Sequence, residues 1–288
     1  AVASAYGDSS FSELCQREGT RLRQNIEQHG WDGQWYRRAY FDDGTPLGSA
    51  SNAECRIDSI SQSWSVLSGA GDDPGNSARS REAMQAVDER LVRRQHALVQ
   101  LLDPPFDKSN LDPGYIRGYV PGVRENGGQY THGAVWAAMA FAELGQGERA
   151  WELLSMINPV NHARSAEGVA TYKVEPYVVA ADVYALSPHI GRGGWSWYTG
   201  SAGWMYRLVV ESLLGLRREG EHLHLAPCLP VAWREFRIHY RYRETTYHIT
   251  VAQTHASNAG QRDVMRMLVD GVERDDRRIP LLDDRQEH

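Results

Sequence analysis

The chain has 288 residues, with 31 Lys and Arg against 37 Asp and Glu, so its formal net charge is −6. This acidic balance excludes a generally basic nucleic-acid-binding protein. No apolar run approaches the roughly 20 residues that cross a bilayer. The first residues carry neither a secretory signal nor an initiator Met, which predicts a processed or excised piece. Cys15, Cys55 and Cys228 are scattered, which predicts thiols in a reducing, cytoplasmic compartment.

The first two hundred residues show mainly helical periodicity. Apolar spacing and capping signals predict helices over residues 11–28, 61–67, 80–102, 131–144, 148–157, 177–186 and 201–214. The helix over 131–144 is apolar nearly all round and should be buried. With the helix over 148–157 it should form an antiparallel hairpin. In the helix over 80–102, the expected buried stripe is Met84, Val87, Leu91, Leu98 and Leu102.

The periodicity changes from helical to alternating after Gly215. Residues 236–243 and 246–251 alternate apolar and polar side chains and predict a β-hairpin. A third strand is expected over 265–269, before the turn signal Asp270-Gly271. The charged tail over 283–288 should be frayed. We therefore predict a division near residue 216, with helices over 1–215 and a small β domain over 216–288.

Long loops rich in glycine and aromatic residues are the main functional signal. The chain has 9 Trp and 14 Tyr but only 5 Phe, and flat rings with a polar edge can stack on sugars or build an aromatic core. The loop over 113–132 combines glycines with Arg124, Glu125, Asn126 and Gln129, which can bind hydroxyl groups. It could equally be a rigid structural loop.

A second loop, over 191–204, leads into the last predicted helix. Free N–H groups and the helix dipole favour an anion at such a point, and Thr199 and Ser201 add hydroxyl donors, although simple capping is the alternative. No phosphate-loop, dinucleotide, metal-ligand or serine-nucleophile motif is present. The carboxylates that a glycosidase would need occur in no recognisable motif and are expected to be caps or structural groups; they are Asp42, Asp43, Glu54, Asp58, Glu125, Glu175 and Asp182.

Several segments together resemble family 94 of the glycoside hydrolases, which are inverting phosphorylases of β-linked glucosides. They cover residues 30–44, 49–64, 119–128, 131–132, 175–177 and 199–206. The sequence of residues 49–64 is most similar to that of the C-terminal phosphorylase module of bacterial cyclic β-1,2-glucan synthases. Arg124 and Ala181 stand where cellobiose phosphorylases tend to carry Lys and Gln, which favours a β-1,2-linked substrate over cellobiose.

The resemblance implies a mainly α fold, a partial (α/α) barrel followed by a small C-terminal β-sandwich. It also implies direct attack of inorganic phosphate on the anomeric carbon, with release of α-glucose 1-phosphate and no further cofactor. Phosphate would be held by His132, Thr199 and Gly200, with a protonated His132 offsetting its charge. The acceptor sugar would be held by Tyr119, Arg124 and Glu125.

One part of the family pattern is absent. The family's general acid lies in a Trp-Asn-Asp string upstream of these motifs, and this sequence contains no such string; Asp32 belongs to a different motif. We therefore expect a C-terminal part of a longer enzyme that is inactive alone and needs the remainder of its polypeptide, whose membrane association stays open. Uncovered apolar faces should make it aggregate or pair with a second copy. The alternatives are an inverting hydrolase on the same barrel and a non-catalytic sugar-binding piece.

Overall fold

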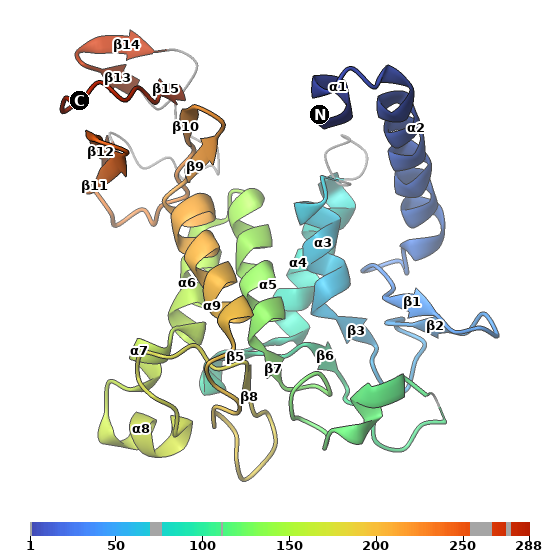
Figure 1. Ribbon diagram of the computed structural model, residues 1–288. Helices are drawn as coiled ribbons and strands as arrows, with labels where there is room; N and C mark the ends of the chain where they lie inside the picture. The colour runs from blue at the N-terminus through green and yellow to red at the C-terminus, as the bar shows by residue number, and fades with distance from the viewer. Residues whose placement is uncertain (1, 70–76, 111, 254–266, 275–277) are drawn as a thin grey trace.

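The structure is a computed structural model that describes residues 2–69, 77–110, 112–253, 267–274 and 278–288 (Figure 1). Helices occupy most of the chain up to Leu213, and strands dominate after it. Each part has its own apolar core, one within residues 35–213 and one within residues 216–281. None of the helices in the described ranges is long and apolar enough to cross a membrane.

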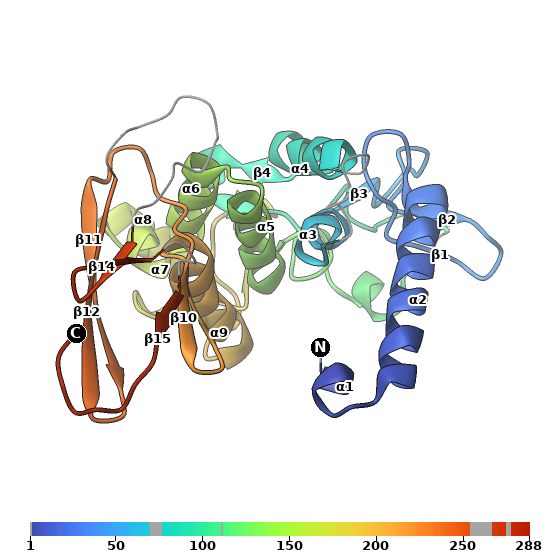
Figure 2. The ribbon, with the colours of Figure 1, turned by 90° about the horizontal axis from the view of Figure 1, so that it is seen from above.

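The N-terminal helices stand apart from the rest of the molecule (Figure 2). Helix α1 spans Val2–Ala5, and α2 spans Ser9–Asn25 and continues as a π-helical turn over Ile26–Gly30. The Asp8 side chain caps α2 by accepting the Phe11 N–H at 3.0 Å. The predicted helix is confirmed, but no side chain of α2 is buried. Its apolar residues Phe11, Leu14 and Leu22 are exposed, so its apolar face is uncovered in this chain.

The centre of the molecule is a row of packed helices (Figure 1). Helix α5, Thr131–Glu143, packs between α3, Ser59–Leu67, and α9, Thr199–Arg207, which continues as a π-helical turn over Leu208–Leu213. Helix α4, Ser77–Arg90, packs on α3, and α6, Gly147–Ile157, packs on α5. The buried α5 and its hairpin with α6 are confirmed, whereas a barrel stays a prediction. Two short helices follow α6: α7, Pro159–His162, and α8, Ala166–Tyr172.

Short strand pairs connect the loops at the end of the molecule where α3, α5 and α9 begin. Ala39–Tyr40 (β1) pairs with Pro46–Leu47 (β2), Ile57–Asp58 (β3) with Leu102–Asp103 (β6), Val92–Arg93 (β4) with Leu98–Val99 (β5), and Gln129–Tyr130 (β7) with Asp182–Val183 (β8). Single 3₁₀ turns occur over Arg94–His96 and Gly114–Gly118. The pairing of β7 with β8 joins the end of the loop over 113–132 to the segment between α8 and α9.

One predicted helix is too long, and another is wrong. The helix predicted over 80–102 ends at Arg90, and the chain then turns back as β4 and β5 through Ala97, which has a left-handed φ of 48°. Its predicted stripe is nevertheless buried. Residues 177–186 form β8 and loop instead of a helix, because their backbone groups bond distant segments. The Ala181 N–H donates to the Trp195 carbonyl, and the Ala181 carbonyl accepts from Thr131.

The C-terminal part is built of strands. Glu235–Tyr242 (β11) and Thr245–Ala252 (β12) form the predicted hairpin, and Met267–Val269 (β13) pairs with Val272–Arg274 (β14) across the predicted Asp270-Gly271 turn. Residues 265–266 of the predicted third strand lie outside the described ranges. Leu216–Glu219 (β9), His222–Leu225 (β10) and Arg278–Pro280 (β15) form a three-stranded sheet in the order β15-β10-β9. A sandwich of two facing sheets stays a prediction.

The charged tail is not frayed, contrary to expectation. The His288 N–H donates to the Thr246 carbonyl, and the His248 N–H donates to the His288 carbonyl. The His288 ring also contacts Asp270 and Asp284. The tail therefore lies along β12 as an added extended segment, because its backbone satisfies the free edge of that strand.

Candidate functional site

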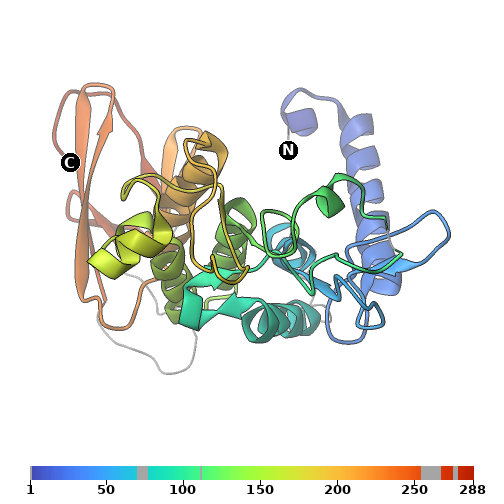
Figure 3. The same ribbon diagram turned by 90° about the horizontal axis from the view of Figure 1, so that it is seen from below.

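The starts of α3, α5 and α9 meet beneath the loops (Figure 3). A Cβ atom built on Gly200, the second residue of α9, would lie 3.8 Å from Cε1 and 3.9 Å from Nδ1 of His132. A Cβ atom on Gly133 would lie 3.6 Å from Oγ of Ser59, at the start of α3. The structure thus brings His132 beside the Thr199–Gly200 helix start, at the spacing of ordinary van der Waals contact.

Aromatic rings lie below His132 along the same helices. The His132 ring centroid is 4.5 Å from that of Trp136 and 5.7 Å from that of Trp204. Trp136 also contacts Trp204 at 5.7 Å and Trp64 at 5.4 Å, both edge to face. The sixth residue of each of these helices is a tryptophan: Trp64 in α3, Trp136 in α5 and Trp204 in α9. They therefore form one aromatic layer across α3, α5 and α9.

The loop that carries Tyr119, Arg124 and Glu125 is held rigidly. The fully buried Asn126 side chain accepts the Phe106 N–H at 2.7 Å and donates to the carbonyls of Phe106 and Tyr119. Arg124 has a positive φ of 50°, a conformation that is uncommon for a residue with a side chain. The amide of Asn126 therefore fixes the conformation of the loop that carries Arg124.

Arg124 is the centre of a small cluster of rings and charges. Its guanidinium carbon lies 4.6 Å from the ring centroid of Trp195 and 5.3 Å from that of Tyr119. Its Nε is 3.5 Å from Oε2 of Glu125, and both side chains are largely buried, with 14% and 15% exposed. The structure therefore brings Tyr119, Arg124 and Glu125 together and adds Trp195 from the second loop.

Asp182, one of the carboxylates that the sequence analysis expected to be structural, joins this cluster. It is fully buried in β8 opposite Tyr130, and its Oδ1 accepts the Trp195 N–H at 3.1 Å. A Cβ on Gly194 would lie 2.4 Å from Oδ1 and 2.5 Å from Oδ2 of Asp182, so only glycine fits there. The signal that could have found Asp182 is its place as a lone charge within the apolar residues 178–185.

Buried polar atoms without hydrogen-bond partners gather in this region. In the described part of the chain they are Ser59 Oγ, Arg124 Nε, Glu125 Oε2, His132 Nε2, Trp136 Nε1, His162 Nε2 and Asp182 Oδ2. All except His162 Nε2 belong to the helix starts, the aromatic layer or the Arg124 cluster described above. Unpartnered buried polar groups are rare because leaving a hydrogen bond unmade is costly. Such a concentration of donors and acceptors marks a place that can bind a polar ligand.

The electrostatics of the cluster follow from burial and from neighbouring charges. Burial lowers the pKa of His132, so the neutral imidazole is favoured and can donate one N–H. Burial raises the pKa of Asp182, while the Trp195 N–H and Arg124 act in the opposite direction. Burial also acts against the charge of Arg124, but Glu125 and other neighbours raise its pKa above the ordinary value. Arg124 is therefore a permanent cation at this site.

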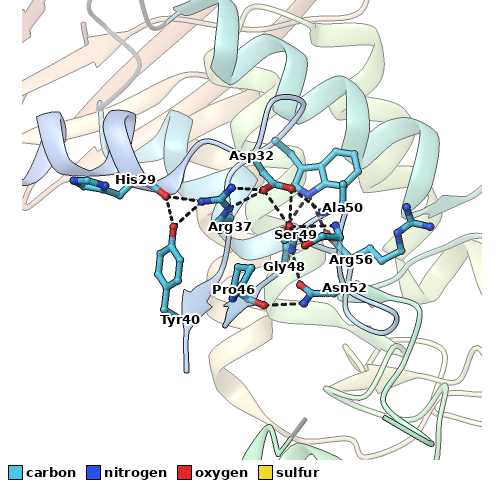
Figure 4. A network of polar contacts seen from close by, with 12 residues as sticks. His29, Asp32, Arg37, Tyr40, Pro46, Gly48, Ser49, Ala50, Asn52 and Arg56 are labelled. Atoms are coloured by element: carbon cyan, nitrogen blue, oxygen red, sulfur yellow. Dashed lines mark hydrogen bonds and ion pairs between the residues drawn. The ribbon is translucent and has the colours of Figure 1, made fainter. Parts of the chain in front are cut away.

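Two further carboxylates, Asp32 and Asp58, have structural partners. The Asp32 carboxylate binds Nε of Arg37 at 2.7 Å, Oγ of Ser49 at 3.0 Å and the Ala50 N–H at 2.7 Å (Figure 4). Asp58 caps α3 through the Ile60 N–H and pairs with Arg38. Asp32 stabilises a loop, and Asp58 stabilises the start of a helix, which is the structural role expected for it from the sequence. Within the described ranges no three His, Cys, Asp or Glu side chains are grouped to hold a metal ion.

Comparison with known proteins agrees with the motifs. Residues 1–215 match the profile of the glycosyl hydrolase 94 superfamily, catalytic domain, and residues 216–271 match the glycosyl hydrolase family 65, C-terminal domain. The chain is 51% identical over 87% of its length to the cyclic beta-(1,2)-glucan synthase NdvB of Rhizobium meliloti, of which it covers 9%. It is 32% identical over 88% of its length to solabiose phosphorylase of Paenibacillus borealis, of which it covers 32%.

A further relative is the 1,2-beta-oligoglucan phosphorylase of Listeria innocua, 29% identical over 51% of this chain and 16% of that protein. The chain spans about a third or less of the length of these relatives. The family match covers most of the chain and includes every residue of the cluster around His132 and Arg124. The resemblance seen in the sequence is therefore confirmed, and the chain belongs to the glycosyl hydrolase 94 superfamily, whose catalytic domain it matches over residues 1–215.

Proposed function

We propose that this chain supplies the phosphate-binding and acceptor-binding part of an inverting glycoside phosphorylase that acts on β-1,2-linked glucans. The observation that carries the proposal is the gathering of unpartnered donors and acceptors around His132 and Arg124. A phosphate ion and a sugar together offer complementary groups to such a mixed set. The names of two relatives, a cyclic beta-(1,2)-glucan synthase and a 1,2-beta-oligoglucan phosphorylase, support the choice of linkage.

The helix start of α9 would hold phosphate. The Thr199 hydroxyl and the Gly200 N–H donate to phosphate oxygens, where the helix dipole favours negative charge. The neutral His132 beside Gly200 donates a further N–H, and a bound anion would raise its pKa. Phosphate needs no metal or organic cofactor for this role, because backbone and side-chain donors supply the favourable field.

The reaction is a displacement at the anomeric carbon of the donor glucose. A phosphate oxygen forms the new bond as the glycosidic oxygen leaves from the opposite face, which inverts a β linkage and gives α-glucose 1-phosphate. The leaving oxygen takes a proton, and a positioned acid contributes typically 10²–10⁴-fold to such a step. We place that acid outside this chain, so the chain alone should not turn over.

The Arg124 cluster would hold the acceptor sugar. Glu125 Oε2 accepts from a sugar hydroxyl, while Arg124 and Tyr119 donate to sugar oxygens. The Arg124 guanidinium lies over the Trp195 ring. In this proposal the helices form part of an (α/α) barrel, with the β part as a sandwich beside it. The remainder of the polypeptide would then cover apolar faces such as that of α2.

Phosphate binding by the isolated chain tests the proposal. The His132 Cε1–H resonance should shift on titration with inorganic phosphate, because the ring faces Gly200. Thr199→Val keeps the shape of the side chain but removes its hydroxyl, and should weaken phosphate about tenfold. Thr171→Val is the matched control, because Thr171 is an exposed residue of α8. An unshifted His132 resonance at high phosphate concentration would contradict the phosphate site.

Product analysis separates the alternatives. The chain mixed with β-1,2-gluco-oligosaccharides and phosphate should give no α-glucose 1-phosphate, whereas a longer enzyme that includes the acid should give it. Phosphate-independent release of free glucose by that longer enzyme would favour an inverting hydrolase. Sugar binding without any turnover in the longer enzyme would favour a non-catalytic sugar-binding role.

A further inference from the structure

Trp197 has a backbone conformation that a bulky side chain disfavours. Its φ is 64°, in the left-handed region, where a large residue is an outlier. Of the eight non-glycine residues with a positive φ in the described ranges, Trp197 is the only aromatic one. Lys173 ends α8 and Asp270 lies in a hairpin turn, where such a φ is common. Trp197 lies outside any helix, strand or turn, so its local structure does not explain the strain.

The Trp197 side chain is exposed, yet it is held in place. The residue is 70% exposed, and its indole N–H donates to Oε1 of Glu175 at 3.1 Å, from the segment that follows α8. The Gly193 N–H donates to the Tyr172 carbonyl and joins the same two segments. A ring that is strained and exposed adds little to the core. Such a cost in stability is typical of residues that contact a ligand.

Trp197 lies between the two parts of the candidate site. Two residues before it, Trp195 has its ring centroid 4.6 Å from the Arg124 guanidinium; two residues after it, Thr199 begins α9. Two residues of chain span at most about 7 Å, so the backbone of Trp197 is close to both. Trp195 and Tyr198 are also exposed, and their rings are 5.7 Å apart. The loop over 195–198 thus carries three exposed rings beside the Arg124 cluster.

The chemistry of this loop suits a chain of sugars. The faces of a glucose ring consist mainly of C–H groups, whereas its hydroxyl groups point outward from its edge. A flat aromatic ring can cover such an apolar face. Because the Trp197 N–H is already bonded to Glu175, the indole needs no hydrogen bond from the ligand and offers its face. Arg124 and Glu125 supply the polar groups that hold the hydroxyls of a neighbouring sugar.

We propose that Trp197 stacks on a further sugar unit of the glucan chain, beyond the acceptor sugar held by the Arg124 cluster. Glu175 acts as a positioning residue that fixes the orientation of the indole ring. This inference rests on the proposed function, because it takes the Arg124 cluster as the place of the first acceptor sugar. The preferred ligand is then a chain of β-1,2-linked glucose units rather than a single glucose.

Affinity as a function of chain length tests this role. Glucose can occupy only the acceptor position, whereas a linear β-1,2-linked trisaccharide also reaches the ring. By calorimetric titration of the 288-residue chain, the trisaccharide should bind about fivefold more tightly than glucose. Trp197→Ala should remove this advantage and leave the affinity for glucose unchanged. Glu175→Ala should reduce the advantage, and Glu175→Gln should keep it, because the amide oxygen can accept the indole N–H.

Trp197→Gly separates binding from stability. Glycine adopts a positive φ without strain, so this variant should keep or raise the melting temperature while it loses the trisaccharide advantage. Arg285→Gly is the matched control, because Arg285 is exposed and has a φ of 63°. It should also keep or raise the melting temperature, but both sugar affinities should stay at the wild-type values. A structural role for Trp197 predicts the opposite for Trp197→Gly, a lower melting temperature and unchanged affinities, and would overturn the proposal.

The remaining outcomes distinguish this inference from the proposed function. Equal wild-type affinities for glucose and trisaccharide, or equal losses for both sugars in Trp197→Ala, would overturn the role of Trp197, while glucose binding would still support the acceptor site. If the wild-type chain binds neither sugar, the acceptor site of the proposed function fails as well. An advantage present in this chain but absent from a longer enzyme would mean that the rest of the polypeptide covers the ring, which also overturns the proposal.

Discussion

Replacing Gly200 with alanine separates the stability of α9 from its capacity to bind an anion. Gly200 is the second residue of α9, and its φ is not positive. Its added Cβ would meet only the His132 ring, at 3.8 Å and 3.9 Å, which is ordinary contact. Alanine is favoured over glycine in helices, so Gly200→Ala should stabilise the chain by about 0.5–1 kcal/mol.

The same methyl group should prevent phosphate from binding. A phosphate held between the Gly200 N–H and His132 needs donor–oxygen distances of about 2.7–2.9 Å on both sides. The Cβ at 3.8 Å from the His132 ring fills the space that its oxygens would occupy. We expect at least a tenfold loss of phosphate affinity, which corresponds to about 1.4 kcal/mol.

Gly203→Ala is the matched control, because Gly203 lies in the same helix and its Cβ would meet nothing within 4 Å. Urea denaturation should show a similar gain in stability for both variants, and the phosphate titration of His132 should be lost only in Gly200→Ala. Equal phosphate affinity in the two variants would refute the anion site. A destabilised Gly200→Ala would instead refute the contact geometry at the helix start.

Three further substitutions test the loops around the site. Burial acts against ionisation of Glu54, but the Ser109 hydroxyl and nearby backbone N–H groups lower its pKa from 4.5 to about 2. A carboxyl group whose pKa is lower in the folded state stabilises the fold at pH values above its unfolded-state pKa. This stabilisation is lost as the pH falls through the folded-state pKa. E54Q should therefore lower the free energy of unfolding by about 1 kcal/mol at pH 7, allowing for solvent screening. In urea melts, the difference in stability from wild type should vanish as the pH falls from 4.5 to about 2. A difference that stays constant with pH would contradict this. G194A would place a Cβ 2.4 Å from the Asp182 carboxylate and should lower the free energy of unfolding by about 1–3 kcal/mol, whereas an unchanged melting temperature would show that the turn can relax. D32A leaves Arg37 without its partner at 2.6 Å and should cost about 2–3 kcal/mol in chemical denaturation; a loss below about 0.5 kcal/mol would mean that the network in Figure 4 is dispensable.

The sequence by itself determined where apolar side chains are buried and where the strongest elements lie. Helix α5 was predictable because it is apolar nearly all round, and ten of its residues are buried. The β11–β12 hairpin was predictable because alternation with a period of two requires no distant partner to be recognised. The quoted motifs also placed His132, Thr199 and Gly200 in one group, and their roles stay predictions.

Tertiary structure decided which backbone groups bond to which. Residues 91–102 have the apolar content of a helix, and Leu91, Leu98 and Leu102 are buried as expected. The chain nevertheless turns back here as β4 and β5, and β6 pairs with β3. Residues 177–186 do not form the predicted helix, because the backbone of Ala181 hydrogen-bonds to the backbones of Thr131 and Trp195, which are distant in sequence. Periodicity reports burial but not the hydrogen-bond partner, which depends on contacts between distant segments.

The importance of Asp182 also came only from the tertiary structure. In the sequence it is one carboxylate among many, within a segment whose apolar pattern predicts a helix. In the fold, the pairing of β8 with β7 and the absence of a side chain at Gly194 place it in the cluster with Trp195 and Arg124. Which groups this carboxylate contacts is set by folding rather than by spacing along the chain.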